Sequence, residues 1–374
     1  MIKVLFMIPN LGHGGAEKVL VNLVNNMDKQ KFDITVMTLY DEGVHKDSLA
    51  AEVSYKTCFK RSFPGVAHVL KLFSPHFLYD WFIHDYYDIV VSYLEGQTAR
   101  IISGCQSINT KKVCWIHRTM STLKDSARLF RNENEEIKCY EAFDKIVFVS
   151  RDVQDAFMKL HHLEDKGTVI YNTNLTDLII KMSNERISSE IFNESEFKIC
   201  AMGTLFPIKG FNRLLKVHKE LVQKNYKVHT YILGEGPEKK QLQKLAKQYG
   251  VEKTFTLLGY QKNPYVYMKK CDLFVCSSFS EGFSTAVTEA LILGLPVVTT
   301  RVSGMTELLG DNQKYGIIVD NDECALLEGI EKIIKDPRLV EYYQKQAKTR
   351  GKEFLKEKTV GSVQNLFEKL GGKI

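Results

Sequence analysis

Two glutamates in one short segment, Glu281 and Glu289, are the residues of this chain best suited to chemistry. Glu281 lies in the loop after an apolar run at 272–277, and Glu289 lies eight residues later in a helical pattern that stops at Gly294. A helix rises about 1.5 Å per residue, so the two carboxylates stand roughly 12 Å apart. Paired carboxylates that act on one glycosidic bond stand only about 5–9.5 Å apart. The spacing therefore favours two contacts at the ends of one elongated ligand.

The residues between the two glutamates open the predicted helix. They are Gly282, Phe283, Ser284 and Thr285. The first N–H groups of a helix have no partner inside it, and the positive end of the helix dipole lies there. The segment therefore predicts a binding site for a phosphate group. The alternative interpretation of the two glutamates is a solvated helix face.

The chain has the composition of an ordinary globular protein, and its charge is nearly balanced. Of its 374 residues, 44% are hydrophobic and 26% are charged, and this length suits two α/β domains. The net charge is +6, and residues 1–170 hold 21 basic and 21 acidic residues, so the excess lies in the second half. A mildly basic second half favours anionic ligands. No basic stripe or nucleic-acid motif accompanies it, which argues against nucleic acid as a partner.

The cysteines and the apolar runs bear on the compartment. The eight cysteines show no Cys-x-x-Cys spacing, so neither a zinc site nor a disulfide framework is expected. The apolar run at the N-terminus is too short for a signal peptide and predicts a first strand. No apolar run approaches the ~18–20 residues that a membrane span requires. We therefore expect a cytosolic protein.

Short apolar runs alternate with helical patterns along most of the chain. Twelve runs are strand candidates: 2–8, 33–39, 88–93, 112–117, 145–149, 167–171, 197–203, 227–233, 253–258, 272–277, 296–300 and 316–319. Apolar strands that alternate with helices indicate parallel sheets covered on both faces. Twelve strands are many for one sheet, so we predict two Rossmann-like halves with a boundary after Asn172. Residues 337–370 have a helical character throughout.

Ligands of open α/β sheets bind outside the carboxyl ends of the strands, and several predicted loops there carry polar or glycine-rich sequence. The loop after the first strand contains Gly12, Gly14 and Gly15, and glycines let a phosphate approach the backbone closely. A dinucleotide fingerprint is the alternative, but the third glycine is missing from its proper spacing and no acidic residue ends the second strand. His117 ends the strand at 112–117. A single histidine is by itself most often structural.

Two further loops lie in the second half. Lys209 and Gly210 come before a helical pattern, where a lysine suits a diphosphate. The strand at 227–233 leads into Gly234-Glu235-Gly236-Pro237, which is good chemistry for a turn from strand to helix. A tight structural turn explains these glycines equally well. Asp320-Asn321-Asp322 follows the last strand and is expected to cap a helix rather than to bind a metal.

Taken together, these segments resemble the retaining glycosyltransferases of family 4. The resemblance rests on Glu281-Gly282-Phe283-Ser284 followed by Glu289-Ala290, on Gly14-Gly15-Ala16-Glu17, and on Lys209-Gly210. It implies the GT-B fold, in which two Rossmann-like domains face a cleft. Residues 1–172 would form the acceptor-side domain, joined by a C-terminal helix at about 352–374, and residues 173–351 would bind the nucleotide sugar.

The resemblance also implies a role for each matching residue. Glu281, Gly282 and Phe283 would contact the donor sugar, with His117 near its anomeric carbon. Gly15, Lys209, Ser284 and Thr285 would bind the donor diphosphate, and Glu289 the ribose. Gly234, Gly236 and Tyr260 would lie on the side of the base, and no metal or other cofactor is expected. Thr204 stands where the family usually has an arginine. Thr204 offers one hydroxyl in place of a bidentate fork, so Lys209 and the helix N-termini would have to suffice, or another basic residue such as Arg213 would substitute.

The form of these motifs is similar to that of enzymes that build bacterial capsule, exopolysaccharide or lipopolysaccharide. Such enzymes commonly use UDP-sugars and lipid-linked saccharide acceptors. Residues 58–87 combine aromatic and basic side chains and fit a segment that lies on the cytoplasmic face of the inner membrane. A buried helix pair with a few surface lysines is the alternative.

Two other functions remain open for this sequence. A UDP-sugar 2-epimerase also has two Rossmann-like domains, but it would need acid and base carboxylates around C2 of the sugar. A non-catalytic homologue that partners another transferase is the second alternative, and the threonine at position 204 is the one feature that favours it.

Overall fold

The computed structural model of the protein describes residues 1–12, 14–120, 122–187 and 191–371. The chain divides into two compact units. The first unit comprises Met1–Thr173 together with Lys356–Ile374, and the second comprises Asn174–Leu355. The first division lies one residue beyond the boundary placed from the sequence. Each unit is a parallel sheet between helices, as the sequence predicts.

The first unit is built on a seven-stranded sheet in the order β3-β2-β1-β4-β5-β6-β7, in which all strand pairs are parallel. The strands are β1 (Ile2–Ile8), β2 (Phe32–Tyr40), β3 (Ser54–Phe59), β4 (Ile89–Ser92), β5 (Lys111–Ile116), β6 (Lys145–Phe148) and β7 (Gly167–Val169). The order reverses between β1 and β4. This is the strand order of a doubly wound Rossmann-like sheet.

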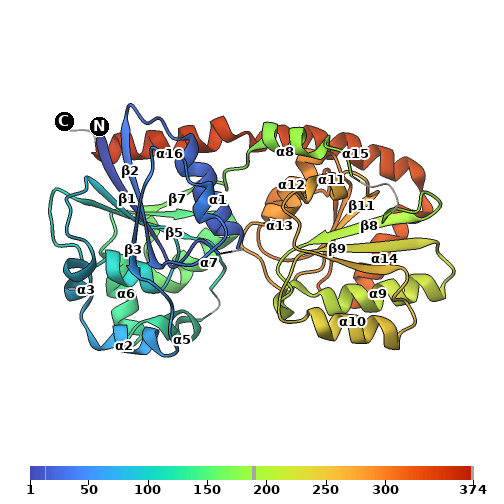
Figure 1. Ribbon diagram of the computed structural model, residues 1–374, viewed down its shortest axis with the longest axis horizontal. Coiled ribbons are helices and arrows are strands. Elements are labelled where there is room, and N and C mark those ends of the chain that lie inside the picture. Colours follow the sequence, from blue (N-terminus) through green and yellow to red (C-terminus); the bar gives the residue numbers. More distant parts are fainter. Residues whose placement is uncertain (13, 121, 188–190, 372–374) are drawn as a thin grey trace. The chain divides into compact units, whose positions relative to one another are not determined.

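Helices cover both faces of the first sheet (Figure 1). They are α1 (Gly15–Asn26), α2 (Val66–Leu72), α3 (Pro75–Phe82), α4 (Gln97–Ile102), α5 (Leu123–Ser126), α6 (Glu133–Glu141), α7 (Arg151–His161) and α16 (Lys356–Gly371). Helix α16 comes from the end of the chain and packs beside β1, where the ring of Phe367 lies 5.8 Å from that of Phe6. The C-terminal helix therefore returns to the first unit, as expected.

One strand of the first sheet was missed in the sequence. Strand β3 lies at the sheet edge beside β2, and its side chains are exposed or only half-buried. An edge strand of this kind needs no apolar run, because little of it is covered. The twelve predicted runs correspond to the other strands, with ends that differ by at most two residues.

The second unit has a six-stranded parallel sheet in the order β10-β9-β8-β11-β12-β13. Its strands are β8 (Phe197–Met202), β9 (Val228–Leu233), β10 (Phe255–Gly259), β11 (Leu273–Cys276), β12 (Val297–Thr300) and β13 (Ile317–Val319). Its helices are α8 (Thr176–Ser183), α9 (Phe211–Gln223), α10 (Lys239–Gln248), α11 (Tyr265–Met268), α12 (Thr285–Leu293), α13 (Met305–Leu309), α14 (Glu323–Lys335) and α15 (Pro337–Gly351). The strand order reverses between β8 and β11.

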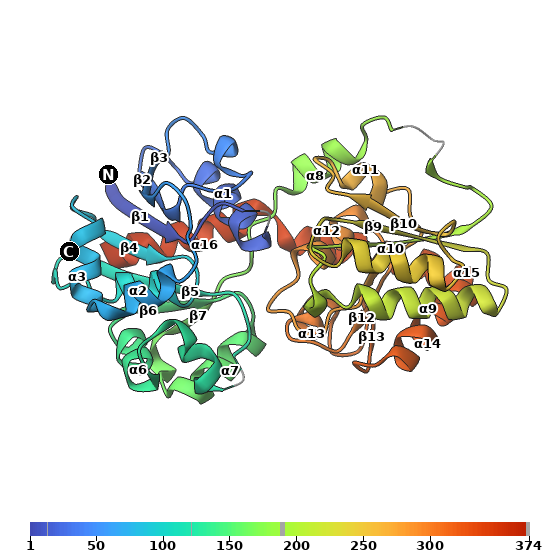
Figure 2. The same ribbon diagram turned by 60° about the horizontal axis from the view of Figure 1, so that its bottom comes forward.

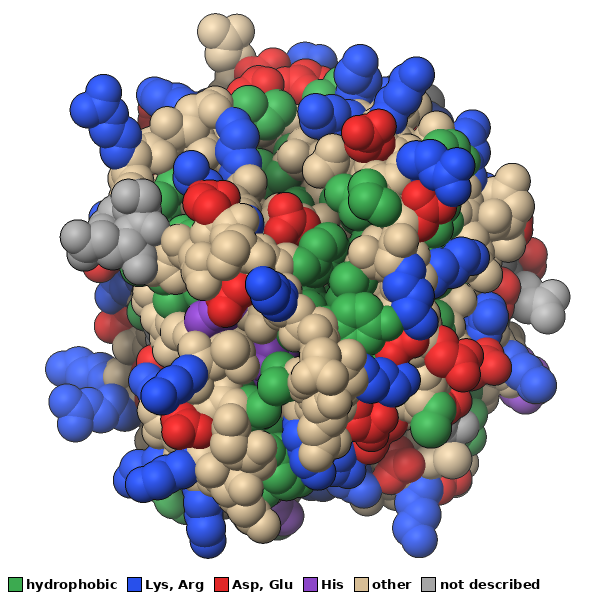
Figure 3. Space-filling view, turned by 90° about the vertical axis from the view of Figure 1, so that its right-hand side faces the viewer, with side chains coloured by type: hydrophobic (Ala, Val, Ile, Leu, Met, Phe, Trp, Pro, Cys, Tyr) green, Lys and Arg blue, Asp and Glu red, His purple; other side chains and the backbone are tan. Residues whose placement is uncertain are grey.

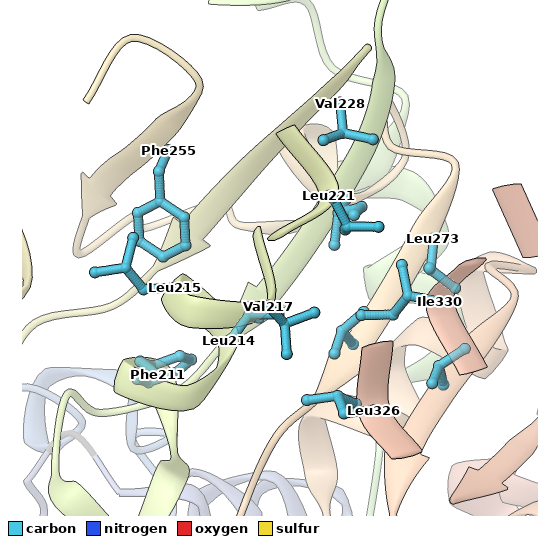
Figure 4. Close-up of a cluster of buried hydrophobic side chains, with 14 of the residues drawn as sticks. Phe211, Leu214, Leu215, Val217, Leu221, Val228, Phe255, Leu273, Leu326 and Ile330 are labelled. Carbon is cyan, nitrogen blue, oxygen red and sulfur yellow. The ribbon is translucent and has the colours of Figure 1, made fainter. Parts of the chain in front are cut away.

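The core of the second unit lies between its sheet and helices α9 and α14 (Figure 4). Leu214, Leu221 and Ile330 are fully buried there, and they come from the apolar stripes of the two helices. Apolar residues that recur every three or four positions give a helix one such face. Burying a side chain of this size contributes roughly 1.5–3 kcal/mol to folding. This core holds the strands whose carboxyl ends carry the candidate site.

The structure bears on several smaller predictions. The Asp322 side chain accepts the N–H of Ala325 at 2.8 Å and so caps α14. All eight cysteines are free, and most are buried. On the face that Figure 3 shows, basic side chains are scattered among acidic ones. Among the described residues, no helix is both long and apolar enough to cross a membrane.

Candidate functional site

The two charged residues expected to meet a ligand lie at the point where the second sheet reverses its strand order. Lys209 ends the loop that follows β8, and Glu281 lies in the loop that follows β11. Strands β8 and β11 are neighbours. Their carboxyl ends diverge into helices on opposite faces, and a crevice at such a reversal is where open α/β sheets bind ligands.

Lys209 and Glu281 form an ion pair. The Nζ atom of Lys209 lies 2.7 Å from Oε1 and 2.9 Å from Oε2 of Glu281. The Ser278 hydroxyl donates a hydrogen bond of 2.6 Å to Oε1 of the same carboxylate. The Lys209 side chain is 30% exposed and that of Glu281 is 10% exposed, so the pair is partly shielded from water. A carboxylate and an ammonium that the sequence assigned to different parts of a ligand are thus held together.

The backbone around this pair is fixed from both loops. The Ser277 hydroxyl donates to the carbonyl of Lys209 at 3.0 Å, and the Thr300 hydroxyl donates to the carbonyl of Ser278 at 2.7 Å. Gly210 has φ +66°, and a Cβ atom there would lie 2.1 Å from the carbonyl oxygen of Ser277. Only glycine fits at this turn without strain. The glycine after Lys209 therefore lets the two loops approach each other.

Helix α12 begins directly after the Glu281 loop, as predicted. Ser284 is its N-cap, with the side-chain oxygen accepting the N–H of Val287 at 3.4 Å. Phe283 is buried, and a Cβ atom on Gly304 would lie 2.5 Å from the carbonyl oxygen of Gly282. The backbone of Gly282 is therefore held close to the start of α13. Thr285 is the first residue of α12.

Glu289 is buried on α12, with only 3% of its surface exposed. The hydroxyl of Tyr265, which is also buried, donates to Glu289 Oε1 at 3.0 Å. Tyr265 belongs to α11, a short helix that packs on α12. A buried polar group costs free energy unless it is hydrogen-bonded, and Tyr265 supplies such a bond. Glu289 is therefore not a residue of a solvated helix face, and Tyr265 is a partner that the sequence did not reveal.

The glycine loop after β9 has a structural explanation of its own. Gly234 has φ +143°, and a Cβ atom there would lie 1.9 Å from the carbonyl oxygen of Gly203. A Cβ atom on Gly236 would lie 2.6 Å from the backbone nitrogen of Leu205. Both glycines thus let this loop pack against the loop that carries Lys209. Tyr260, which follows β10, is 51% exposed.

Arg213, the suggested substitute for the missing arginine, does not join the Lys209–Glu281 pair. Its guanidinium stacks on the ring of Phe279 at 3.6 Å from the ring centre and donates to Asn321 Oδ1 at 2.7 Å. The side chain is buried, and burial lowers its pKa. Arg213 therefore faces α14 and its preceding loop, and Thr204 remains without an arginine beside it in the described contacts.

In the first unit, His117 follows β5 as predicted, and its imidazole is neutral. Burial lowers the pKa of His117 to about 3, against the opposing effect of a backbone hydrogen bond at Tyr93. Its Nε2 atom is buried and has no hydrogen-bond partner among the described residues. The imidazole contacts the ring of Tyr93, with 5.0 Å between ring centres. A buried nitrogen without a partner is uncommon, because leaving it unsatisfied is costly.

Glu95 and Arg118 are site residues that the sequence analysis missed. The Glu95 carboxylate accepts the backbone N–H of His117 at 3.1 Å and binds Arg118 Nε at 3.0 Å. Burial raises the pKa of Glu95, and Arg118 acts in the opposite direction. Glu95 lies in the loop after β4, and that position at a strand end was a signal that could have found it. It links this loop to His117 and Arg118, which follow the neighbouring strand β5.

The glycine loop after β1 leads into α1. Gly15 is the first residue of that helix and is exposed. The Glu17 carboxylate folds back over Gly14, where a Cβ atom would lie 2.1 Å from Glu17 Oε2. Burial raises the pKa of Glu17. Among the described residues, no three His, Cys, Asp or Glu side chains are grouped so that they could hold a metal ion.

Comparisons with known proteins agree with the fold of both units. Residues 13–173 match the family model described as Glycosyltransferase Family 4, and residues 183–350 match Glycosyl transferases group 1. HepE from Anabaena, solved in complex with UDP, superimposes with a TM-score of 0.78 at 18% identity, over 98% of this chain and 100% of that one.

Two relatives from Campylobacter jejuni are similar along nearly their full length. One is N-acetylgalactosamine-N,N'-diacetylbacillosaminyl-diphospho-undecaprenol 4-alpha-N-acetylgalactosaminyltransferase, which is 26% identical over 96% of this chain and 97% of its own. The other is an alpha-1,4-N-acetyl-D-galactosaminyltransferase whose acceptor is a GalNAc-containing saccharide on diphospho-undecaprenol; it is 24% identical over 95% of both chains.

Proposed function

Because the chain belongs to the glycosyltransferases with the GT-B fold, we propose that it transfers a hexose or N-acetylhexosamine from a UDP-sugar to a lipid-linked saccharide in the synthesis of a bacterial surface polysaccharide. The observation that carries the proposal is the Lys209–Glu281 ion pair at the strand reversal of the second unit. It joins a group suited to sugar hydroxyls to a group suited to phosphate. Helix α12 starts immediately behind it.

In this proposal the two residues of the pair take separate roles when the donor binds. Glu281 accepts hydrogen bonds from hydroxyls of the donor sugar. Lys209 turns toward the diphosphate and, with the first N–H groups of α12 at Ser284 and Thr285, stabilises the charge that grows on the leaving phosphate. Preorganised donors of this kind contribute most where negative charge develops in the transition state. The helix dipole adds to the same effect.

Glu289 is the proposed ligand of the ribose diol. A carboxylate has about four acceptor sites. The Tyr265 hydroxyl donates to Glu289 Oε1, and the ribose hydroxyls would donate to the same carboxylate. Tyr265 would keep the carboxylate in one orientation. The base would lie along Gly234, Gly236 and Tyr260. The glycines are fully explained by loop packing, so Tyr260, an exposed ring after β10, is the sharper test of base contact.

We further propose that the reaction retains the anomeric configuration and needs no metal. The two Campylobacter relatives are named as makers of alpha linkages, and an alpha-linked donor would then keep its configuration. The leaving phosphate oxygen would take the proton of the acceptor hydroxyl. His117 would orient the donor sugar as a neutral imidazole, and Gly15 would approach the diphosphate through its backbone at the start of α1.

The acceptor side is proposed to work at the cytoplasmic face of the membrane. Within residues 58–87, Phe63, Leu72, Phe77 and Trp81 are exposed, whereas Phe59, Phe73 and Phe82 are half-buried. These exposed side chains favour a surface segment over a buried helix pair with a few surface lysines. Exposed aromatic and aliphatic side chains beside lysines are typical of helices that lie at a bilayer interface.

The deciding experiment is a thermal-shift screen of UDP- and GDP-sugars, followed by transfer to a polyprenyl-diphosphate saccharide. A bound donor raises the unfolding temperature by mass action. We expect a shift with UDP-sugars and alpha-linked product formation, both reduced in Glu281→Ala. Conversion of the donor to its C2 epimer without acceptor would instead indicate an epimerase, and donor binding without turnover a non-catalytic homologue. Loss of activity with EDTA that manganese restores would contradict metal independence.

A further inference from the structure

A hollow lined by basic side chains lies in the first unit, and of its lining residues only Lys71, in the segment 58–87, was given a role above. It has a volume of about 470 Å³ and lies where α6 begins. Its basic lining consists of Lys71, Lys124, Arg128 and Arg131. Helices α2, α5 and α6, which supply or flank these residues, are neighbours in Figure 1. We call this feature the cationic hollow. Nothing in the sequence pattern singled it out.

The frame of the hollow is fixed by arginines that bind backbone carbonyls. Arg131 donates through Nε to the carbonyl of Lys71 at 2.6 Å and through Nη2 to that of Leu72 at 2.8 Å. Arg100, buried and paired with Glu135 at 2.9 Å, donates to the carbonyls of Leu70 and Phe73. The end of α2 is therefore held by two guanidinium groups. These contacts explain Arg100 and Arg131 as structural residues.

Lys71 donates through Nζ to the carbonyl of Arg128, which leaves two cations of the hollow that these structural contacts do not explain. Lys124 and Arg128 are exposed on α5 and the turn after it. Arg128 pairs with Asp125 at 2.8 Å, and Glu133 also lines the hollow. Arg131 lies 3.7 Å from Glu135, but that carboxylate is shared with Arg100, so the two arginines together outweigh it. The hollow keeps a net positive charge. Its shape and charge suit a compact anion such as a phosphate or diphosphate group.

A band of contacting aromatic rings leads to the same place. We call it the aromatic strip: Phe63, Phe59, Phe82, Trp81, Phe77 and Phe73. The strip ends at Phe73, within the segment whose carbonyls Arg100 and Arg131 bind. Leu72, between Phe73 and Lys71 of the hollow, is 76% exposed. An apolar strip that runs into a cationic hollow matches an amphipathic molecule with an anionic head.

We propose that the cationic hollow binds the diphosphate head of a polyprenyl-linked acceptor, while the aromatic strip lies along the membrane surface. The inference rests on the proposed function, because it names where that acceptor's head would bind. A phosphate carried by a lipid satisfies both features at once. A soluble phosphate would use the hollow and leave the strip without a role, and an apolar partner would leave Lys124 and Arg128 without one.

The test is vesicle flotation of the full chain with three kinds of phosphatidylcholine vesicle. One contains no other lipid, one contains phosphatidylglycerol, and one contains polyprenyl diphosphate at matched surface charge. The test variant is Lys124→Gln with Arg128→Gln, two exposed residues outside the assigned site. Its control is Lys240→Gln with Lys244→Gln, which removes the same charge from exposed positions on α10 of the second unit. Inorganic pyrophosphate serves as the soluble competitor.

We expect wild type and control to prefer polyprenyl-diphosphate vesicles, and pyrophosphate to compete. Two basic side chains near an anionic surface correspond to about a 30-fold change in affinity, so the test variant should lose most of this preference. Phe77→Ser with Trp81→Ser should weaken binding to all three vesicles. Equal losses on phosphatidylglycerol vesicles would mark a general anionic-membrane surface and overturn the proposal, as would no loss at all.

The outcome can be separated from that of the proposed function. Donor binding is measured by thermal shift without vesicles, and lipid binding is measured without donor. A diphosphate preference that depends on Lys124 and Arg128 would stand even if no nucleotide sugar bound. Donor binding with no such preference would leave the transferase proposal intact and remove the hollow from it.

Discussion

The ammonium of Lys209 lies between the two carboxylate oxygens of Glu281, at 2.7 and 2.9 Å. The two residues are 72 positions apart in the chain and meet because β8 and β11 are adjacent where the strand order reverses. Each neutralises the other in the structure. A diphosphate that competes for Lys209 would therefore also change the surroundings of Glu281, so the two side chains should be coupled in donor binding.

Lys209→Met and Glu281→Gln should each lower kcat/KM by roughly 10²–10³-fold, the range seen when one group that stabilises developing charge is removed. The double variant should lose less than the product of the two single losses, because residues of one network are not additive. The measurement is a double-mutant cycle on transfer kinetics. Lys209→Arg, which keeps the charge, should fall between wild type and Lys209→Met. Fully multiplicative losses would show that the two side chains act independently and would contradict the proposed coupling.

The same cycle on the free energy of unfolding should give a small coupling. The Lys209 side chain is 30% exposed, and partly exposed ion pairs contribute only about 0–1 kcal/mol. Urea unfolding of the four proteins checks this. A large coupling in stability would mean that the pair serves mainly the fold, and the kinetic losses would then need correction for misfolded protein.

Tyr265→Phe tests the assignment of Glu289. The substitution removes only the hydroxyl that donates to Glu289 Oε1 at 3.0 Å, and both side chains are buried. Losing one hydrogen bond to a buried charged group costs about 1.5–3 kcal/mol. If Glu289 binds ribose, KM for the donor should rise about tenfold with little change in kcat. A ribose-modified donor that lacks the 2'-hydroxyl should show a smaller effect of the substitution. An unchanged KM would argue that Tyr265 does not orient the Glu289 carboxylate for donor binding.

The sequence sufficed for features that are local in the chain. Strands such as β8 and β11 are continuous apolar runs. Lys209 and Glu281 lie in the loops that follow them, and His117 directly follows β5, so the places of all three at strand ends could be predicted. Pairings between loops could not, because they depend on which strands lie side by side. The contact between Tyr265 and Glu289 depends on the packing of α11 on α12. Tyr265 also follows Asn263-Pro264, a pair typical of a turn.

Exposure set a second limit on prediction. Strand β3 was missed because an edge strand with exposed side chains has no apolar run to detect. The cationic hollow was missed for a related reason. Lys71 lies far in the chain from Lys124, Arg128 and Arg131, and the hollow exists because Arg131 binds the end of α2. The charge of each segment taken alone gives no sign of it.

Glu95→Gln should separate the two contacts that Glu95 makes in the first unit. Glutamine can still accept the N–H of His117 through its amide oxygen, but it loses the charge that pairs with Arg118 at 3.0 Å. Burial raises the pKa of the Glu95 carboxyl, so glutamine should be tolerated by the fold. We expect a lower kcat with donor affinity nearly unchanged. Arg118→Gln is the matched variant, and it should reproduce the loss if the pair acts as a unit. Normal kcat in both variants would remove this pair from the reaction.

His218 offers a test of how burial couples to pH in the second unit. It lies fully buried on α9, between the hydroxyls of Thr230 and Thr254, at 2.9 Å from each. Burial, aided by the neighbouring His229, lowers the pKa of His218 to about 3. An unfolded histidine has a pKa of about 6.5. Between these values the unfolded chain binds a proton that the folded chain does not, so the stabilisation by neutral His218 is complete above pH 6.5 and declines as the pH falls toward 3.

His218→Gln removes this titration while leaving the other ionisable groups in place. The variant should be less stable than wild type at pH 7, because its side chain cannot match both threonine contacts in a packed core. The difference in free energy of unfolding should shrink as the pH falls from 6.5 to 4, by up to about 1.4 kcal/mol per pH unit. Urea unfolding, followed by far-UV circular dichroism at several pH values, measures this difference. Lys240→Gln, an exposed change on α10, should track wild type at every pH. A difference that stays constant between pH 7 and 4 would show that His218 keeps an ordinary pKa in the folded protein.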